Sequence, residues 1–206
     1  MQLSRKYGIP TEIALIYDFA NSLDLRQFVH NGVQRVTNDE LATPEKLSEW
    51  MVSHGLLVRR TALSKAAHAQ ALRLRSVLRS FIQLEPGAAR RDPDVAKKLN
   101  EVAAQFPLVA NLDPRGTLGL VPVRRDGVNS LADVLVALEH AATMSKLDRL
   151  KMCASTECHW IFYDRSKPSS RRWCMAELCG NREKTRAYRK RHQHEHDTGE
   201  RPRGRH

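Results

Sequence analysis

The placement of the four cysteines is the feature that most constrains what this 206-residue chain can fold into. All of them lie after residue 152, in the pattern C-x4-C-x15-C-x4-C: Cys153, Cys158, Cys174 and Cys179. Two close pairs on either side of a hairpin-length insert are typical of a tetrahedral zinc site, because each pair supplies two thiolates from one tight turn. The spacing therefore predicts a structural zinc ion with these four ligands and no open position for a catalytic water.

Two disulfide bonds are the alternative use of four cysteines. The sequence begins Met-Gln-Leu-Ser-Arg-Lys, without an apolar leader, so we expect a cytoplasmic protein in which short loops between cysteines favour metal over oxidation. No apolar run approaches the roughly 18 residues of a membrane-spanning helix, and no membrane association is expected. His159 is a rival ligand, but we expect it on a strand, pointing away from the metal bound by its neighbour Cys158.

The stretch at residues 153–191 contains four short sequence motifs, most of which include a cysteine: CHWIFYD at 158–164, SK at 166–167, RRWCM at 171–175 and CGNR at 179–182. In this order and spacing they resemble the CGNR zinc fingers of bacteria. Upstream, LIYDFANSLD at 15–24 and TPEKL at 43–47, with Trp50, resemble two motifs of the ABATE domain that usually precedes this finger. That family is regarded as stress-responsive transcription regulators, and the resemblance implies the same role for this chain.

The charge of the chain is concentrated at its C-terminal end. Residues 1–150 carry 20 Lys and Arg against 16 Asp and Glu, whereas residues 151–206 carry 14 against 7. A basic zinc module beside a nearly balanced domain favours a polyanion partner, and we predict DNA; a merely solvated basic tail is the alternative. The expected domains are an ABATE-like helical domain for sensing or dimerisation at 1–150, the zinc finger at 151–191 and a disordered basic tail at 192–206.

The first 150 residues predict a mainly α structure with one small β-hairpin, an α+β chain. Apolar residues at helical spacing predict helices over residues 11–29, 44–53, 61–84, 93–106 and 130–150, the last entering the finger directly. Alternating apolar residues at 108–123, around Asp-Pro-Arg-Gly, predict the only sheet of this part. Ser130 and Asp133 resemble a capping box. Arg73, Arg75 and Arg79 lie off the apolar stripe of their helix and are expected to face solvent.

The finger is expected to have a treble-clef-like order of knuckle, hairpin and helix. A strand is predicted over residues 159–163, a return strand over 171–174 and a helix from Cys179 to about residue 191, with Ala187 and Tyr188 packed inward. A module of about 40 residues buries too little apolar area to fold alone, so zinc binding, worth about 10–16 kcal/mol in such peptides, should stabilise the fold.

The residues predicted to contact DNA lie on the return strand and on the helix after the last cysteine. They are Arg171, Arg172, Asn181, Arg182, Lys184, Arg186, Arg189 and Lys190. Arginine and lysine can bind phosphates, and Arg or Asn can read base edges. For Asn181 and Arg182 a structural role beside the metal is equally open, Asn181 as a cap and Arg182 as an ion-pair partner of Asp164 or Glu183.

We interpret the chain as a DNA-binding transcription regulator that acts as a homodimer. The alternative is an interaction protein whose finger binds a protein or RNA partner. Tyr17, Asn21 and Asp24, near the end of the first helix, are candidate residues of a pocket for a small-molecule effector, although polar residues there more often satisfy the backbone. No catalytic residue is proposed, because the sequence contains no nucleophile–base pair, phosphate-binding glycine loop or open metal site that would indicate an enzyme.

Overall fold

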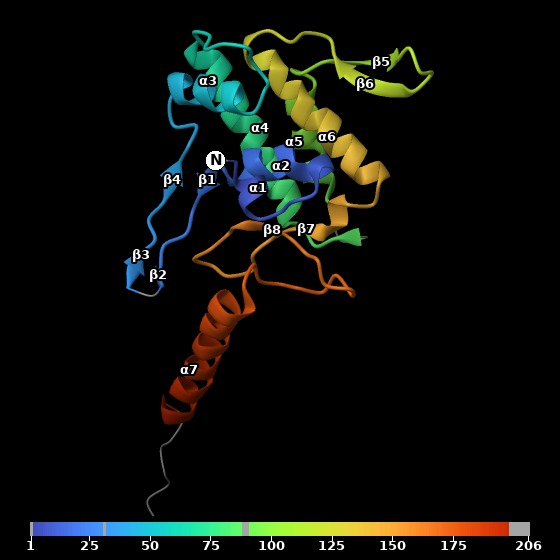
Figure 1. The fold of residues 1–206 in the computed structure, drawn as a ribbon. Helices are drawn as coiled ribbons and strands as arrows, with labels where there is room; N and C mark the ends of the chain where they lie inside the picture. Colours follow the sequence, from blue (N-terminus) through green and yellow to red (C-terminus); the bar gives the residue numbers. More distant parts are fainter. Residues whose placement is uncertain (1, 31, 88–90, 198–206) are drawn as a thin grey trace, which may run out of the picture.

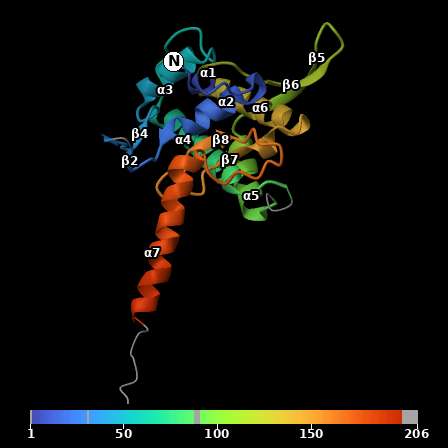
Figure 2. The same ribbon diagram turned by 60° about the horizontal axis from the view of Figure 1, so that its bottom comes forward.

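The computed structural model describes residues 2–30, 32–87 and 91–197, and it is mainly α-helical with small antiparallel sheets, as the sequence predicts. The α-helices of this part are α1 (Leu3–Lys6), α2 (Thr11–Asn21), α3 (Pro44–Ser53), α4 (Lys65–Gln83), α5 (Pro93–Ala103), α6 (Ala132–Thr143) and α7 (Asn181–Asp197). Helices α1 to α6 form one body, and α7 projects away from it (Figure 1; Figure 2). In the described part of the chain, every helix is too short or too polar to span a lipid bilayer.

Helices α2 and α4 provide the centre of the core. Ile13, Ile16 and Phe19 of α2 are fully buried, as are Leu74 and Leu78 of α4 to within a percent. This burial follows from the helical spacing of these apolar residues, which places them on one face of each helix. The predicted start of α3 is confirmed as well, because the Thr43 hydroxyl accepts a hydrogen bond from the backbone N–H of Lys46.

The expectation that the arginines of α4 face solvent is wrong for two of the three. Arg75 and Arg79 are only 4% and 6% exposed, whereas Arg73 is exposed. Arg75 donates to both carboxylate oxygens of Asp39, at 2.6 and 2.7 Å, and Arg79 donates to backbone carbonyls, among them that of Ala20. The helix α2 ends beside them, and its last carbonyl groups have no partner within the helix, so buried cations can satisfy them. Spacing along α4 cannot reveal such acceptors.

The predicted β-hairpin is confirmed, but it is not the only sheet before the finger. Strands β5 (Leu108–Leu112) and β6 (Leu118–Pro122) pair antiparallel, and Asp113 accepts from the backbone N–H groups of Arg115 and Thr117 in the turn. Two shorter antiparallel pairs precede it in the chain: β1 (Leu23–Asp24) with β4 (Asn38–Asp39), and β2 (Val29–His30) with β3 (Val33–Gln34).

These short strands occupy residues that the periodicity assigns to the first helix. Helix α2 ends at Asn21 and not near residue 29, because the Ser22 hydroxyl donates to the Phe19 carbonyl and the following residues pair with β4. The apolar residues after Asn21 recur at helical spacing in the sequence, but in the structure they lie in extended backbone.

The connection from α6 to the finger also differs from the expectation. A 3-10 turn, η2 (Gly127–Leu131), precedes α6, and Asp133 pairs with Arg125 at 2.6 Å, so no capping box forms. Helix α6 ends at Thr143, and Ser145 adopts a left-handed backbone with φ of 54°. A second 3-10 turn, η3 (Leu147–Arg149), then leads into strand β7 (Leu150–Met152).

Strand β7 is the partner of the finger's predicted strand. It pairs antiparallel with β8 (Ile161–Tyr163), which places Lys151 opposite Phe162. The predicted return strand at residues 171–174 is wrong, since this segment is a loop that is linked to the first cysteine loop by the hydrogen bond from Ala154 N–H to the Arg172 carbonyl. The finger is thus built on a hairpin that begins before its first cysteine.

Candidate metal centre

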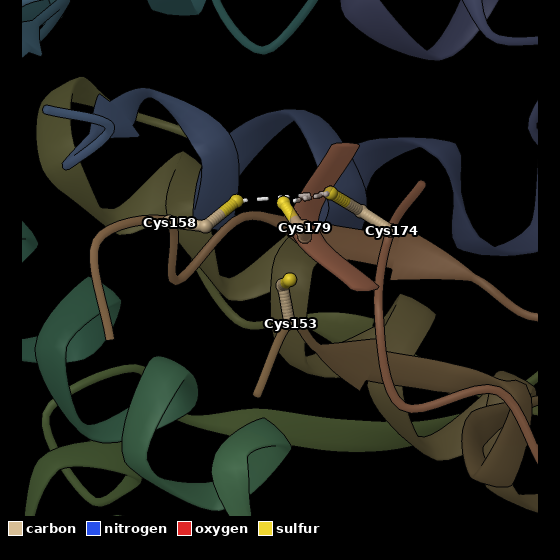
Figure 3. A group of neighbouring side chains, drawn as sticks. All are labelled: Cys153, Cys158, Cys174 and Cys179. Carbon is tan, nitrogen blue, oxygen red and sulfur yellow. Dashed lines mark hydrogen bonds between the residues drawn. The ribbon is translucent and has the colours of Figure 1, made fainter. Parts of the chain in front are cut away.

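The four cysteine side chains meet at one point, as Figure 3 shows. Their sulfur atoms all lie within 4.8 Å of one another, and the Cys158–Cys174 and Cys174–Cys179 separations are both 3.7 Å. A tetrahedron of thiolates with metal–sulfur bonds of about 2.3 Å places its sulfurs about 3.8 Å apart. The separations therefore match a zinc ion with four cysteine ligands, and four thiolates close its coordination shell.

Each cysteine is positioned by a local backbone structure. Cys153 directly follows β7, and Cys158 ends a turn closed by its N–H bond to the Ser155 carbonyl. Cys179 lies in a wide helical turn, η4 (Ala176–Gly180), which joins α7 without a break. Among the described residues the cluster contains no histidine: His159 has a left-handed φ of 50° and is not on a strand, although the expectation that it stays out of the cluster holds.

The thiols form a single acid–base system. All four are free, and 3.7 Å is far beyond the about 2.05 Å of a disulfide bond. Hydrogen bonding to Cys153 is the main cause that raises the pKa of Cys158 and of Cys174, whereas hydrogen bonding from Cys158 is the main cause that lowers the pKa of Cys153. A bound zinc ion would take the place of the shared protons, which is the usual coupling of metal binding to thiol ionisation.

A buried carboxylate fixes the loop that carries Cys174. Asp164 is fully buried and accepts from Lys151 Nζ at 2.9 Å, from Ser166 N–H at 2.9 Å and from Arg171 N–H at 2.8 Å. Burial acts to raise the pKa of Asp164, but the hydrogen bonds from Ser166 and Lys151 outweigh it and hold that pKa at about 2. The ionised carboxylate ties this loop to β7.

The start of α7 is held against the first cysteine loop by Glu157. Its carboxylate forms ion pairs with Arg182 and Arg186, and Arg186 also pairs with Glu183 at 2.9 Å. The guanidinium of Arg182 lies 4.3 Å from the ring centroid of Phe28. Arg182 thus has an ion-pair partner that the sequence analysis missed. The only sequence feature that could have indicated this partner is an acidic residue between the first two cysteines, in a module that also contains a basic helix.

The other predicted DNA contacts divide into side chains that have a partner in this structure and side chains that have none among the described residues. Asn181 donates to the Glu177 carbonyl at 3.0 Å, Arg171 donates to the Cys174 carbonyl at 2.7 Å, and Arg172 lies over the Trp173 ring at 5.6 Å. Three of the predicted contacts on α7 are exposed and have no ion-pair or hydrogen-bond partner among the described residues: Lys184, Arg189 and Lys190. Ala187 and Tyr188 are exposed and not packed inward as expected. The predicted tail is helical to Asp197, and residues 198–206 lie outside the described part.

The three residues predicted to form an effector pocket have other roles in this structure. Tyr17 is buried and accepts from Trp160 Nε1 at 3.2 Å, and burial raises the pKa of Tyr17. The Asn21 amide bonds to both the N–H and the carbonyl of Ile161, at 3.0 and 2.9 Å. Asp24 forms an ion pair with Arg26. Tyr17 and Asn21 therefore join α2 to the finger.

Two family models match the chain, one after the other. The model described as "Putative stress-induced transcription regulator", the ABATE domain, matches residues 14–146, and the model of the CGNR zinc finger matches residues 149–192. The matches confirm the resemblance drawn from the sequence motifs and agree with a zinc ion at the four cysteines. No curated protein matches the chain.

Proposed function

The chain belongs to the "Putative stress-induced transcription regulator" family, with a C-terminal CGNR zinc finger, and on this premise we propose that it binds DNA through α7. A regulator of transcription needs a surface for nucleic acid, and the charge of the chain is concentrated in its last 56 residues, which carry 14 Lys and Arg against 7 Asp and Glu. This role would place the protein in the cytoplasm, with the chromosome.

The observation that carries the proposal is the exposure of α7. The helix leaves the body at the zinc site and projects from it, so that most of its length is accessible (Figure 1; Figure 2). Lys184, Arg189, Lys190 and Arg191 are exposed along it. Like charges three or four residues apart destabilise a helix by a few tenths of a kcal/mol per pair, and phosphates would reverse the sign of that interaction.

The ion pairs at the base of α7 assign different roles to its arginines. Glu157 forms ion pairs with Arg182 and Arg186, so these two arginines hold the helix against the loop between Cys153 and Cys158. The phosphate contacts then fall to exposed side chains of α7 that Glu157 does not bind, Lys184, Arg189 and Lys190. A zinc ion bound by Cys179 would fix the orientation of α7, because Cys179 lies in the turn from which the helix starts.

A variant with Lys184→Ala, Arg189→Ala and Lys190→Ala tests the proposal. Each lost phosphate contact should weaken binding to all DNA duplexes alike and reduce the slope of log affinity against log salt by about 0.9. Fluorescence anisotropy with labelled duplexes at several salt concentrations measures both quantities. The matched control is Lys97→Ala with Lys98→Ala, which removes exposed charge from α5 and should leave the slope unchanged.

An unchanged affinity and slope in the α7 variant would contradict DNA binding by this helix. The finger would then be better explained as a module for a protein or RNA partner.

We propose that the second copy of a homodimer is bound by the β5–β6 hairpin. This hairpin extends from the body at the end opposite to α7 (Figure 1), and the cross-strand pair Leu112 and Leu118 is 66% and 70% exposed. Val109 of β5 and Val123, the residue directly after β6, are about half exposed. Apolar side chains gathered on one exposed element are typical of an interaction surface, and two-fold symmetry would present two copies of α7 to neighbouring half-sites.

A further inference from the structure

A β-hairpin of the helical body lies beside the start of α7. It is formed by β2 and β3, and in both views it reaches the end of the body from which α7 projects (Figure 1; Figure 2). Gly32, between the two strands, has a left-handed φ of 74°, a backbone that glycine adopts easily and that allows a tight turn. The hairpin is therefore a narrow projection next to a basic helix.

Two contacts attach this hairpin to the base of α7. The Gln27 N–H donates to the Glu157 carbonyl at 3.1 Å, and the ring centroid of Phe28 lies 4.3 Å from the guanidinium of Arg182. Phe28 directly precedes β2 and is only 6% exposed, and Glu157 also forms an ion pair with Arg182. The hairpin, the first cysteine loop and the start of α7 thus contact one another, which fixes the position of the hairpin relative to the helix.

The hairpin and its flanks carry one uncompensated positive charge. Residues 25–38 contain two arginines, Arg26 and Arg35, and no Asp or Glu. Arg26 is paired with Asp24, which accepts from its Nε at 2.8 Å and from its Nη2 at 2.5 Å. Arg35 directly follows β3, where its backbone N–H donates to the Phe28 carbonyl at 2.8 Å. Its side chain is exposed and forms no hydrogen bond or ion pair with the described residues.

Three exposed valines indicate that this segment is an interaction surface. Val29, Val33 and Val36 are 61%, 58% and 66% exposed, and apolar side chains gathered on one projection are typical of such a surface. A second copy of the chain is a poor fit, because a two-fold contact places the same patch on both sides and residues 25–38 offer Arg35 no acidic partner. DNA supplies the opposite charge, and apolar side chains also contact base edges in its grooves.

We propose that the β2–β3 hairpin is a second DNA contact, in which Arg35 binds a phosphate. This inference rests on the proposed binding of DNA by α7. An α-helix with its side chains is about 10–12 Å across and fills a major groove about 12 Å wide. A structure held beside the start of such a helix meets the sugar–phosphate backbone at the edge of the groove, and the hairpin brings Arg35 to that place. The DNA surface then spans the helical body and the finger.

Arg35→Ala in the full-length, zinc-loaded protein tests the proposal. It should weaken binding to all DNA duplexes alike and reduce the slope of log affinity against log salt by about 0.9, as expected for one lost phosphate contact. Arg35→Lys keeps the charge and should retain most of the slope. Arg59→Ala is the matched control and should leave the slope unchanged, because Arg59 is exposed in the loop between α3 and α4, away from α7 (Figure 1). Fluorescence anisotropy at several salt concentrations measures all three variants.

The α7 variant distinguishes a failure of this inference from a failure of the proposed function. If Lys184→Ala with Arg189→Ala and Lys190→Ala lowers the slope while Arg35→Ala does not, the hairpin is not a DNA contact and binding by α7 stands. If neither variant changes the slope, both proposals fail.

Val33→Ser with Val36→Ser separates DNA from a second copy of the chain as the partner of the hairpin. Sedimentation equilibrium should give this variant the mass of the unaltered protein. A lower mass would show that the hairpin contacts a second chain, and it would overturn the proposal.

Discussion

Arg79 shows how single residues join the helical body to the zinc centre. Its guanidinium donates to the carbonyls of Ala20 in α2, of Leu23 in β1 and of His159 beside the zinc ligand Cys158. Burial lowers the pKa of Arg79 to about 10, which leaves the side chain charged at neutral pH. A change at the end of α2 can therefore reach the backbone next to Cys158 through one side chain.

Replacing Arg79 by Met should destabilise the protein by about 2–4 kcal/mol, because it leaves buried carbonyls without a donor. Urea unfolding measures the loss, and the rate of zinc transfer to a chelator should rise as well. Arg73→Met is the control on the same helix, since Arg73 is exposed. Equal stability of the two variants would show that Arg79 is not needed to satisfy these carbonyls.

Glu157 is the second residue whose role follows from its contacts. Because Glu157 pairs with Arg182 and Arg186, Glu157→Gln should leave Arg182 without its ion-pair partner and Arg186 with Glu183 alone. If α7 binds DNA, this variant should bind all duplexes more tightly and show a steeper salt dependence, by up to about 0.9 per added phosphate contact. Anisotropy titrations at several salt concentrations decide it, with Glu177→Gln on the preceding turn as control. Weaker binding would mean that the ion pairs position α7 for DNA and do not compete with it.

At the scale of elements, local patterns predicted what local interactions determine. The cysteine spacing identified the metal centre, and Thr43-Pro44 and Asp92-Pro93 identified the starts of α3 and α5, because each signal and its structural cause lie within a few residues. The pairing of β7 with β8 was missed because residues 150–152 continue the apolar pattern of α6. Nothing in the periodicity marks the end of that helix at Thr143.

The burial of Arg75 and the anchoring of Arg182 could not be predicted for a different reason. Their partners, Asp39 and Glu157, lie 36 and 25 positions earlier in the sequence. Only the folded chain brings these charges together. Residue spacing shows which face of a helix a side chain lies on, but it does not show which distant residues pack against that face.

The finger as an element should depend on its metal. Cys174→Ser removes one of four ligands and should abolish stoichiometric zinc binding, because three thiolates no longer close the tetrahedron. Cys153, Cys158 and Cys179 are part of the same buried core as Ile13 and Leu74, but α2 also packs against α6, and α4 against α5, so the helical signal should be largely retained.

Elemental analysis and far-UV circular dichroism on the same sample test this expectation. Ser170→Ala, at an exposed position in the loop before Cys174, is the control, because it changes the same loop without removing a metal ligand. Loss of most helical signal would show that the body cannot fold without the zinc site. Because Asn21 and Arg79 contact the finger, we expect the Cys174→Ser variant to keep its helices but to melt at a lower temperature than the unaltered protein.

At the scale of the whole molecule, the two proposed interaction surfaces are separate. The apolar β5–β6 hairpin lies at one end and α7 at the other (Figure 1). Tyr17 and Asn21 hydrogen-bond to the finger from α2, a helix at the centre of the core. Helix α2 therefore links the core of the helical body to the finger that carries α7.

The proposed dimer is tested at this scale. Leu112→Ser with Leu118→Ser should shift the protein from dimer to monomer, because it removes the exposed apolar pair from the hairpin. Sedimentation equilibrium gives the mass directly. Val58→Ser, which changes another exposed apolar side chain in the loop between α3 and α4, is the control. A monomeric unaltered protein, both free and with DNA, would contradict the proposal.

The projecting helix also determines how the molecule moves through solvent. A helix of 17 residues is about 25 Å long at 1.5 Å per residue, comparable with the diameter of a small domain. A compact body with a rod of that length experiences more friction than a sphere of equal mass. A single chain should therefore elute early in gel filtration, at the position of a larger globular protein, and its frictional ratio should fall towards that of a sphere when the chain is cut after Asn181.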